Sequence, residues 1–178
     1  RLGTDRSYND VLPSLNLVYG LSETMNLRAA ATRTLARPTF REIAPVTTFD
    51  FTSDGALQGN PALERTLITN LDLRWEWFNA PGQILAVSAY YKRLNNPIER
   101  VITDAENGAT SYANVDVADV SGAECELRQA LGTLGLGGVL GERLSLGANL
   151  SLTESSITVT ERELAARLGR EGRARVAP

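Results

Sequence analysis

Apolar and polar residues alternate along most of the chain. The clearest run is residues 67–78, where for example the apolar Leu71 and Leu73 alternate with the charged Asp72 and Arg74. Successive side chains of a β-strand point to opposite faces, whereas an amphipathic helix would not place a charged residue at every second position over this length. The pattern therefore predicts a strand with one apolar face and one charged face.

Other segments show the same period, so six strands are predicted in all. They lie near residues 12–19, 26–37, 66–78, 84–93, 114–129 and 144–156. In the second of them, Leu27 and Ala29 share one face, while Asn26 and Arg28 share the other. One face is apolar enough for lipid and the other is polar enough for a wet lumen, which is typical of a membrane barrel.

Connections between the predicted strands are alternately short and long. The turns after the first, third and fifth strands are shorter, whereas residues 38–65, 94–113 and 157–178 form long connections. Transmembrane barrels have this asymmetry, with short periplasmic turns and long extracellular loops. We therefore predict an all-β fold for residues 1–178, namely an antiparallel up-and-down transmembrane β-barrel segment.

Two tryptophans lie at one end of the third predicted strand. Trp75 and Trp77 come just before the turn at residues 79–82. Tryptophan gathers at membrane interfaces because its ring is apolar while its N–H requires a polar partner. We therefore expect this end of the strand to mark a bilayer boundary.

Composition removes several other classes of function. The formal net charge of −3 gives no basis for a nucleic-acid partner. Histidine is absent and Cys125 is the single cysteine, which argues against His-dependent triads, disulfides and most metal sites. Nothing in the sequence fixes a catalytic pair of carboxylates, so we predict neither an enzyme nor a cofactor.

No apolar run approaches the ~20 residues that a membrane helix requires. The chain begins at Arg1 without a signal-peptide pattern. We expect it to be a piece of a longer chain, because it starts without Met and residues 173–178 form a polar tail.

The first long connection contains most of the candidate ligand-binding residues. Loops of this length are usually functional or disordered, and the aromatic residues within this one favour a loop that folds on itself. The predicted ligand-binding residues are Arg37, Phe40, Arg41, Phe49 and Phe51, together with Tyr90 on a later strand. Two roles are open for Tyr90, which are stacking on a ligand and filling space.

Three arginines at the base of this loop have two interpretations. Arg33, Arg37 and Arg41 would form a basic surface that meets an anionic ligand or a lipid phosphate. Alternatively, they would pair with carboxylates such as Glu42 and Asp50 and so brace the loop, since arginine suits bidentate contacts. Bracing is the favoured interpretation.

Acidic residues raise two further possibilities. Asp50 and Asp54 would offer oxygen ligands to calcium, but they lack the spacing of a known calcium loop. Glu124, Glu126 and Arg128 would line a substrate path or form a cross-strand salt-bridge ladder, and the ladder is favoured.

Four segments carry short motifs. They are residues 12–17 (LPSLNL), 32–45 (TRTLARPTFREIAP), 59–64 (GNPALE) and 121–127 (SGAECEL). These motifs resemble strand, loop and turn signatures of the TonB-dependent outer-membrane receptors, and the second is closely similar to a signature of one large branch. The turn motif departs from the family pattern, because Arg65 and Thr66 follow where the family has a second proline and a glutamate.

This resemblance implies a barrel of about 22 strands, plugged by an N-terminal domain upstream of Arg1. It also implies active import of a scarce nutrient, such as a siderophore, vitamin, oligosaccharide or peptide, with energy transmitted by TonB. The expected partners are the nutrient, the TonB complex through the plug, and lipid of the bacterial outer membrane. The alternatives are a passive porin, an adhesin-type barrel, and a soluble β-rich binding module.

Overall fold

The structure is a computed structural model that describes residues 7–50, 55–104, 109–134 and 144–158. These residues are almost entirely β, with one short helix, α1 (Phe40–Ile43), and one 3-10 turn, η1 (Leu131–Leu134). No helix in the described part of the chain is both long and apolar enough to cross a membrane. The predicted connection at 157–178 lies outside the described residues beyond Thr158.

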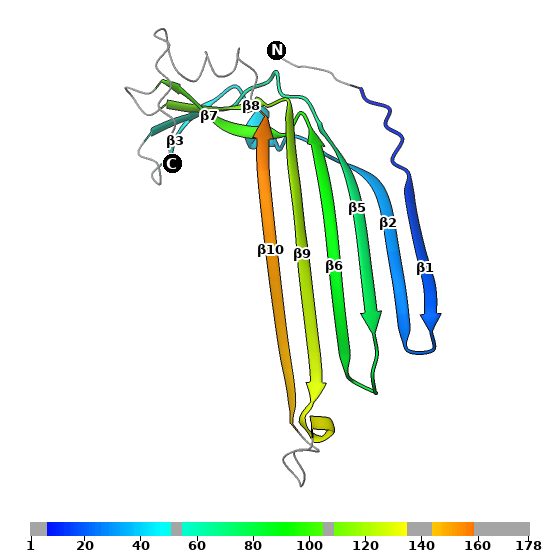
Figure 1. The fold of residues 1–178 in the computed structure, drawn as a ribbon. Helices are drawn as coiled ribbons and strands as arrows, with labels where there is room; N and C mark the ends of the chain where they lie inside the picture. Colours follow the sequence, from blue (N-terminus) through cyan, green and yellow to red (C-terminus); the bar gives the residue numbers. More distant parts are fainter. Residues whose placement is uncertain (1–6, 51–54, 105–108, 135–143, 159–178) are drawn as a thin grey trace.

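Six strands form one antiparallel sheet in the order β1-β2-β5-β6-β9-β10. They are β1 (Ser14–Ser22), β2 (Met25–Ala36), β5 (Thr66–Trp77), β6 (Ile84–Asn95), β9 (Val117–Ala130) and β10 (Ser145–Thr158). Figure 1 shows them as a tall wall with β1 and β10 at its two edges. The predicted fold class is confirmed, as an open segment of a barrel wall.

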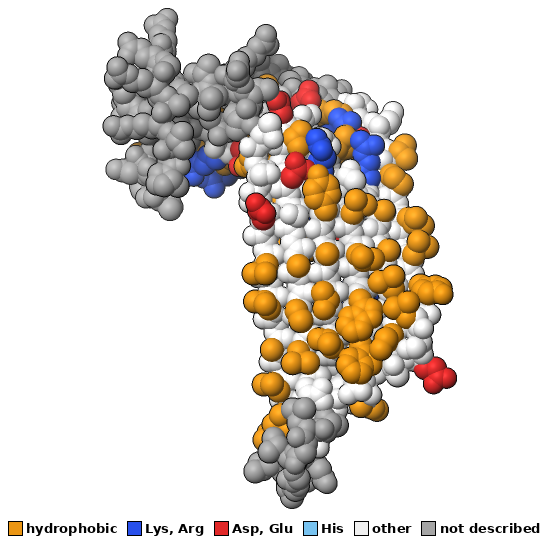
Figure 2. Space-filling view, viewed as in Figure 1, with side chains coloured by type: hydrophobic (Ala, Val, Ile, Leu, Met, Phe, Trp, Pro, Cys, Tyr) orange, Lys and Arg blue, Asp and Glu red, His pale blue; other side chains and the backbone are white. Residues whose placement is uncertain are grey.

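The register sorts side chains onto two different faces. One row of cross-strand partners consists of Leu17, Ala29, Leu73, Ala89, Ala123 and Leu152. The next row along the strands points to the opposite face and consists of Asn16, Ala30, Asp72, Tyr90, Gly122 and Thr153. We refer to the first face as outward and to the second as inner. Figure 2 shows apolar side chains covering the outward face, with charged side chains gathered mainly at its upper end.

A second, smaller sheet is built from the long connections. Its strands are β3 (Thr47–Asp50), β4 (Gly55–Gln58), β7 (Ile98–Asp104) and β8 (Ala109–Asn114), in the order β3-β4-β8-β7. We refer to this sheet and α1 together as the platform, which lies at the top of the wall in Figure 1. The sequence pattern predicted these segments only as loops. Their strands are short, and β4 pairs in parallel with the distant β8, which local alternation does not reveal.

The β7–β8 hairpin extends directly from the wall. Beyond the β6–β9 ladder, the Asn96 N–H donates to the Asp116 carbonyl at 3.0 Å, and the Val115 N–H donates to the Pro97 carbonyl at 2.9 Å. Asn96 has a φ of 54°, a conformation that asparagine tolerates better than most residues. The wall strands therefore bend at Asn96 and continue into the platform.

Buried apolar residues of the described chain concentrate where the platform joins the wall. They include Ala44, Leu57, Leu63, Val115 and Ala118, each at most 8% exposed. The outward leucines differ, since Leu73 is 50% exposed and Leu152 is 64% exposed. The wall thus has an apolar face that needs an apolar surrounding, whereas the platform base has a packed core of its own.

A charged residue on the outward face tests this assignment. Leu73→Arg, made in the full-length protein in lipid bilayers, is expected to lower the free energy of unfolding by about 2–4 kcal/mol, because the guanidinium would lie within hydrocarbon. Unfolding in urea, followed by tryptophan fluorescence, measures the change.

The matched control is Ser151→Arg, which places the same side chain on an exposed position of the inner face. This variant is expected to change the free energy of unfolding much less. Equal destabilisation by the two substitutions would contradict the assignment of the faces.

Candidate functional site

The side chain of Asn114 holds the two long connections together. Its Nδ2 donates to the Asn96 carbonyl at 2.8 Å and to the Glu64 carbonyl at 3.0 Å. Its Oδ1 accepts a hydrogen bond from the Glu64 N–H at 2.7 Å. A single amide therefore links the end of the first connection to both ends of the second, at Asn96 and at Asn114 itself.

Gly59 and Asn60 form a second link between the connections. Asn60 Nδ2 donates to the Tyr112 carbonyl at 2.8 Å, and its Oδ1 accepts from the Ala62 N–H at 2.8 Å. A Cβ on Gly59 would lie 2.0 Å from the Ala44 carbonyl oxygen, so only glycine fits there. The GNP motif, which the sequence indicated as a turn, thus also anchors one loop against the other.

An open pocket of about 450 Å³ lies at the base of the platform. Its lining includes Tyr8, Arg37, Ile43, Leu63 and Arg65. Arg65 is fixed by an ion pair with Asp10 at 2.7 Å and lies 4.1 Å from the centre of the Tyr8 ring. The predicted ligand-binding residue Arg37 therefore lines the same pocket as the guanidinium of Arg65.

The other predicted ligand-binding residues occupy three places. Phe40 and Arg41 lie on α1, where Phe40 is 84% exposed, and Phe49 lies on β3 with 54% exposure. Phe51 lies outside the described residues. Tyr90 lies on β6, on the inner face of the wall, and so does not join the loop residues.

Loop bracing by the three arginines is not borne out for Glu42. Among the described residues, Arg33, Arg37 and Arg41 form no ion pair. Glu42 instead accepts a hydrogen bond from the Thr39 N–H at 2.7 Å, at the start of α1. The Asp50 side chain and the whole of Asp54 lie outside the described residues.

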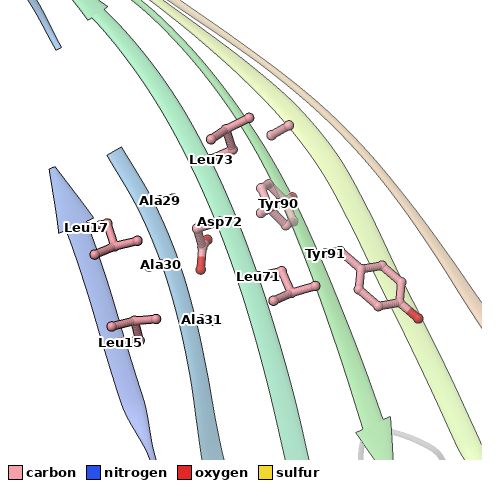
Figure 3. A pocket seen from close by; sticks show the side chains of 11 residues that line it. Leu15, Leu17, Ala29, Ala30, Ala31, Leu71, Asp72, Leu73, Tyr90 and Tyr91 are labelled. Atoms are coloured by element: carbon pink, nitrogen blue, oxygen red, sulfur yellow. The ribbon is translucent and has the colours of Figure 1, made fainter. Parts of the chain in front are cut away.

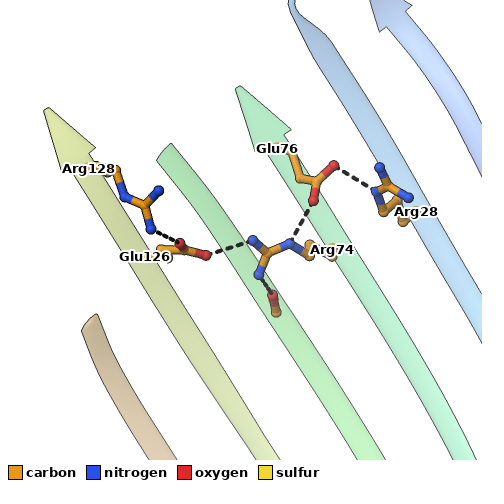
Figure 4. Close-up of polar contacts among 6 residues, drawn as sticks. Arg28, Arg74, Glu76, Glu126 and Arg128 are labelled. Carbon is orange, nitrogen blue, oxygen red and sulfur yellow. Dashed lines mark hydrogen bonds and ion pairs between the residues drawn. The ribbon is translucent and has the colours of Figure 1, made fainter. Parts of the chain in front are cut away.

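A ladder of charged side chains crosses the inner face, as Figure 4 shows. Glu76 accepts from Arg28 Nε at 2.7 Å and from Arg74 Nε at 2.9 Å. Arg74 Nη2 donates to Glu126 at 2.8 Å, and Arg128 lies 3.9 Å from the other oxygen of Glu126. The ladder therefore links β2, β5 and β9.

Arg74 reaches β9 by crossing β6. The β6 residues on its path are Ser88, which accepts from Arg74 Nη1 at 3.1 Å, and Ala86, which lies in register between Glu76 and Glu126. These small side chains leave room for the guanidinium. The predicted salt-bridge ladder thus holds for Glu126 and Arg128, whereas Glu124 has no ion-pair partner among the described residues.

Tyr90 packs across the inner face toward β10. Its hydroxyl lies 2.7 Å from Thr153 Oγ1, and a Cβ on Gly122 would lie 2.5 Å from the Tyr90 ring. Gly122 therefore leaves the space that the tyrosine ring fills. Of the two roles open for Tyr90, space filling has direct geometric support.

The all-β fold and its alternation of short turns and long connections agree with a comparison against protein families. Residues 2–171 match the family described as "TonB dependent receptor-like, beta-barrel". The chain belongs to this family. The family forms barrels in the outer membrane of Gram-negative bacteria, so the chain lies in that membrane. The outward face of its wall meets lipid and the inner face meets the lumen.

Solved structures of TonB-dependent receptors share this fold. The siderophore receptor PirA from Pseudomonas aeruginosa is 23% identical with a TM-score of 0.62, over 82% of this chain and 25% of that chain. A double mutant of the ferric enterobactin receptor PfeA from the same organism is 22% identical with a TM-score of 0.57, over 80% of this chain and 21% of that chain. No curated protein sequence matches the chain.

This chain spans a quarter or less of the length of these receptors, and at such low identity the likeness concerns the fold. TonB-dependent receptors as a family are transporters.

Sequence reasoning missed several residues of the receptor's loop base and lumen. The contacts between the loops made by Asn60 and Asn114 could not be predicted, because Tyr112 and Glu64 lie about 50 positions away from them in the chain. The ladder left a clearer signal, since Asp72, Arg74 and Glu76 alternate in sign on one face of a strand. The short turn after that strand also fixes Arg74 opposite Ser88.

Breaking the link at Asn114 is expected to uncouple the two receptor loops. Asn114→Ala removes three hydrogen bonds, and Gly59→Ala introduces a clash with the Ala44 carbonyl that costs about 1–3 kcal/mol locally. Each variant should speed limited proteolysis of residues 38–65 and 94–113 in the folded receptor, because local opening becomes more frequent.

Thr103→Ala is the control, since among the described residues the Thr103 hydroxyl bonds only within the β7–β8 hairpin, to the Ala109 carbonyl. It is expected to leave the cleavage rate in residues 38–65 unchanged. Wild-type cleavage rates in both Asn114→Ala and Gly59→Ala would show that these contacts do not hold the loops together.

Proposed function

We propose that this chain is part of the barrel wall of an active transporter, which binds a scarce nutrient at its extracellular loops and imports it with TonB-coupled energy. Membership of the receptor family supports this function. The observation that carries it is the platform, in which two extracellular loops are joined over the end of the wall by Asn60 and Asn114. Such a joined surface is suited to binding, whereas the loops of a passive pore need no such joint.

A siderophore is the nutrient class that we favour over a vitamin, an oligosaccharide or a peptide. PirA is a siderophore receptor, and one PfeA structure was solved in complex with enterobactin. The platform also offers suitable chemistry, because Phe40 and Phe49 expose aromatic rings on the same connection that carries Arg41. Aromatic rings and guanidinium groups suit an anionic ligand that itself carries aromatic groups.

The predicted ligand-binding residues divide into two sets in this proposal. Arg37, Phe40, Arg41, Phe49 and Phe51 belong to the loop that meets the ligand first. Tyr90 belongs to the lumen, where its ring would border the route that the ligand takes after capture.

The two faces of the wall have different partners in this proposal. The lumenal ladder, with Asp72 and Glu124 beside it, would face the N-terminal plug, through which the TonB complex acts. The outward face would contact lipid. The mechanism involves no bond chemistry, because capture at the loops and movement of the plug are sufficient for import.

Uptake by cells tests the proposal. The full-length receptor is expressed in a Gram-negative host that lacks its own siderophore receptors, and uptake of radioiron-labelled enterobactin and of other siderophores is measured. Saturable uptake that disappears when tonB is deleted is the expected result for at least one siderophore. Uptake that persists without TonB would indicate a passive porin, and recovery of the receptor in the soluble fraction would contradict a membrane role.

Replacing Phe40 and Phe49 together by alanine should weaken binding of the transported siderophore by about tenfold or more, because exposed aromatic anchors contribute much of such binding energy. Thr47→Ala on the same β-strand as Phe49 is the matched control and should bind as the wild type does. Unchanged affinity in the double variant would remove these residues from the site.

A further inference from the structure

We infer that the outward face carries a specific binding site for a phosphate-bearing lipid of the outer leaflet, with an acyl chain along β2 and the phosphate at Arg33. The inference rests on the outer-membrane location of the barrel and deepens the lipid contact proposed above. It assigns this contact to particular residues.

An apolar groove on the outward face provides the place for the acyl chain. Its floor includes Ala29 and Ala31 on β2, and its sides are formed by leucines of β1 and β5, as Figure 3 shows. The bordering leucines are Leu15, Leu17, Leu71 and Leu73. Small residues between two rows of large ones leave an open groove of about 460 Å³ that runs along β2.

The register confirms that these residues share one face. Leu17, Ala29 and Leu73 are successive cross-strand partners, and so are Leu15, Ala31 and Leu71. Ala30, Asp72 and Tyr90 also border the groove, but the alternation of each strand directs their side chains to the lumen. The groove is therefore closed to the lumen and open to lipid.

A basic row crosses the upper end of the groove. Arg33 follows Ala31 by two positions on β2, which is a rise of about 7 Å along the strand. Arg33 lies in register with Thr69, and Thr69 lies in register with Arg93. Two guanidinium groups and a hydroxyl thus interrupt the rows of leucines, and Leu35 and Leu67 pair in the next outward row.

These two arginines are exposed and form no ion pair in the described part of the chain, although the Arg93 side chain interacts with the Tyr91 hydroxyl. Asp119 lies across from Arg93, but one of its carboxylate oxygens accepts the hydrogen bond of the Tyr91 hydroxyl. An outward guanidinium at the edge of hydrocarbon needs an anionic or polar partner, because its burial without one is costly. Arginine binds phosphate with two parallel hydrogen bonds, and a lipid supplies phosphate at this height.

One lipid would satisfy both features at once. Its phosphate would lie at Arg33, with Arg93 as a second donor, and its chain would pass Ala31 and Ala29 between the leucines. The groove ends where Leu27 and Trp75 pair across the strands, so these larger side chains limit the length of chain that it holds.

Native mass spectrometry of the full-length receptor in detergent tests the site, with lipid A as the probe. Arg33→Ala is expected to weaken lipid A binding by about tenfold, since one charge-assisted contact is lost. Ala31→Leu is expected to weaken it similarly by filling the groove, although no charge is removed. Arg128→Ala, which removes an exposed guanidinium from the lumenal face, should bind lipid A as the wild type does.

Removing the phosphates of lipid A separates the two halves of the site. Dephosphorylated lipid A should bind wild type and Arg33→Ala equally, while Ala31→Leu should still bind it less well. Wild-type affinity for lipid A in Arg33→Ala or in Ala31→Leu would overturn the proposal. Displacement of bound lipid A by millimolar inorganic phosphate, or a receptor dimer that excludes lipid from this face, would also overturn it.

Siderophore uptake by the same variants distinguishes this proposal from the proposed function. Arg33→Ala should import siderophore normally, because its side chain faces lipid. A wild-type receptor that binds lipid A as described but imports nothing would contradict the transport function and leave the lipid site standing.

Discussion

Backbone hydrogen bonding is the constraint on which this structure depends. Hydrocarbon offers no partner to an N–H or C=O group, and each unsatisfied group there costs several kcal/mol. The six wall strands meet this constraint by pairing along nearly their whole length, from the β1–β2 hairpin to the β9–β10 pair. Each side chain then has only to suit its own surroundings, which are lipid on one face and a wet lumen on the other.

This division leaves the wall without a packed core, so its specific contacts are polar or local. The lumenal ladder joins β2, β5 and β9 through Arg74 and its two glutamates. At the outer end the reverse holds, because Leu57, Leu63 and Val115 are buried where two loops meet the strand ends. In our proposal, ligand capture takes place on the platform and lipid contact on the outward face of the wall, so each can vary without disturbing the other.

The wall could be predicted from the sequence because its pattern is local. Apolar and charged residues alternate along β5 from Leu71 to Glu76, and the short turn after β5 fixes β6 as its antiparallel neighbour. The platform could not, since β4 finds its partner β8 about 50 residues away and the amide of Asn114 acts between loops. For the same reason the GNP motif suggested only a turn, although Gly59 is required by the distant Ala44 carbonyl. Among the candidate ligand residues, the sequence could name side-chain chemistry but not which residues share a surface.

The two-faced wall is tested most directly by attaching spin labels, one at a time, along residues 69–75 of the full-length receptor in lipid bilayers. The account predicts that labels at Leu71 and Leu73 are reached by oxygen dissolved in lipid, whereas labels at Asp72 and Arg74 are reached by a water-soluble nickel complex or are shielded from both reagents. The two accessibilities should alternate with a period of two. Equal access of the nickel complex to all of these positions, or a period near that of a helix, would contradict it.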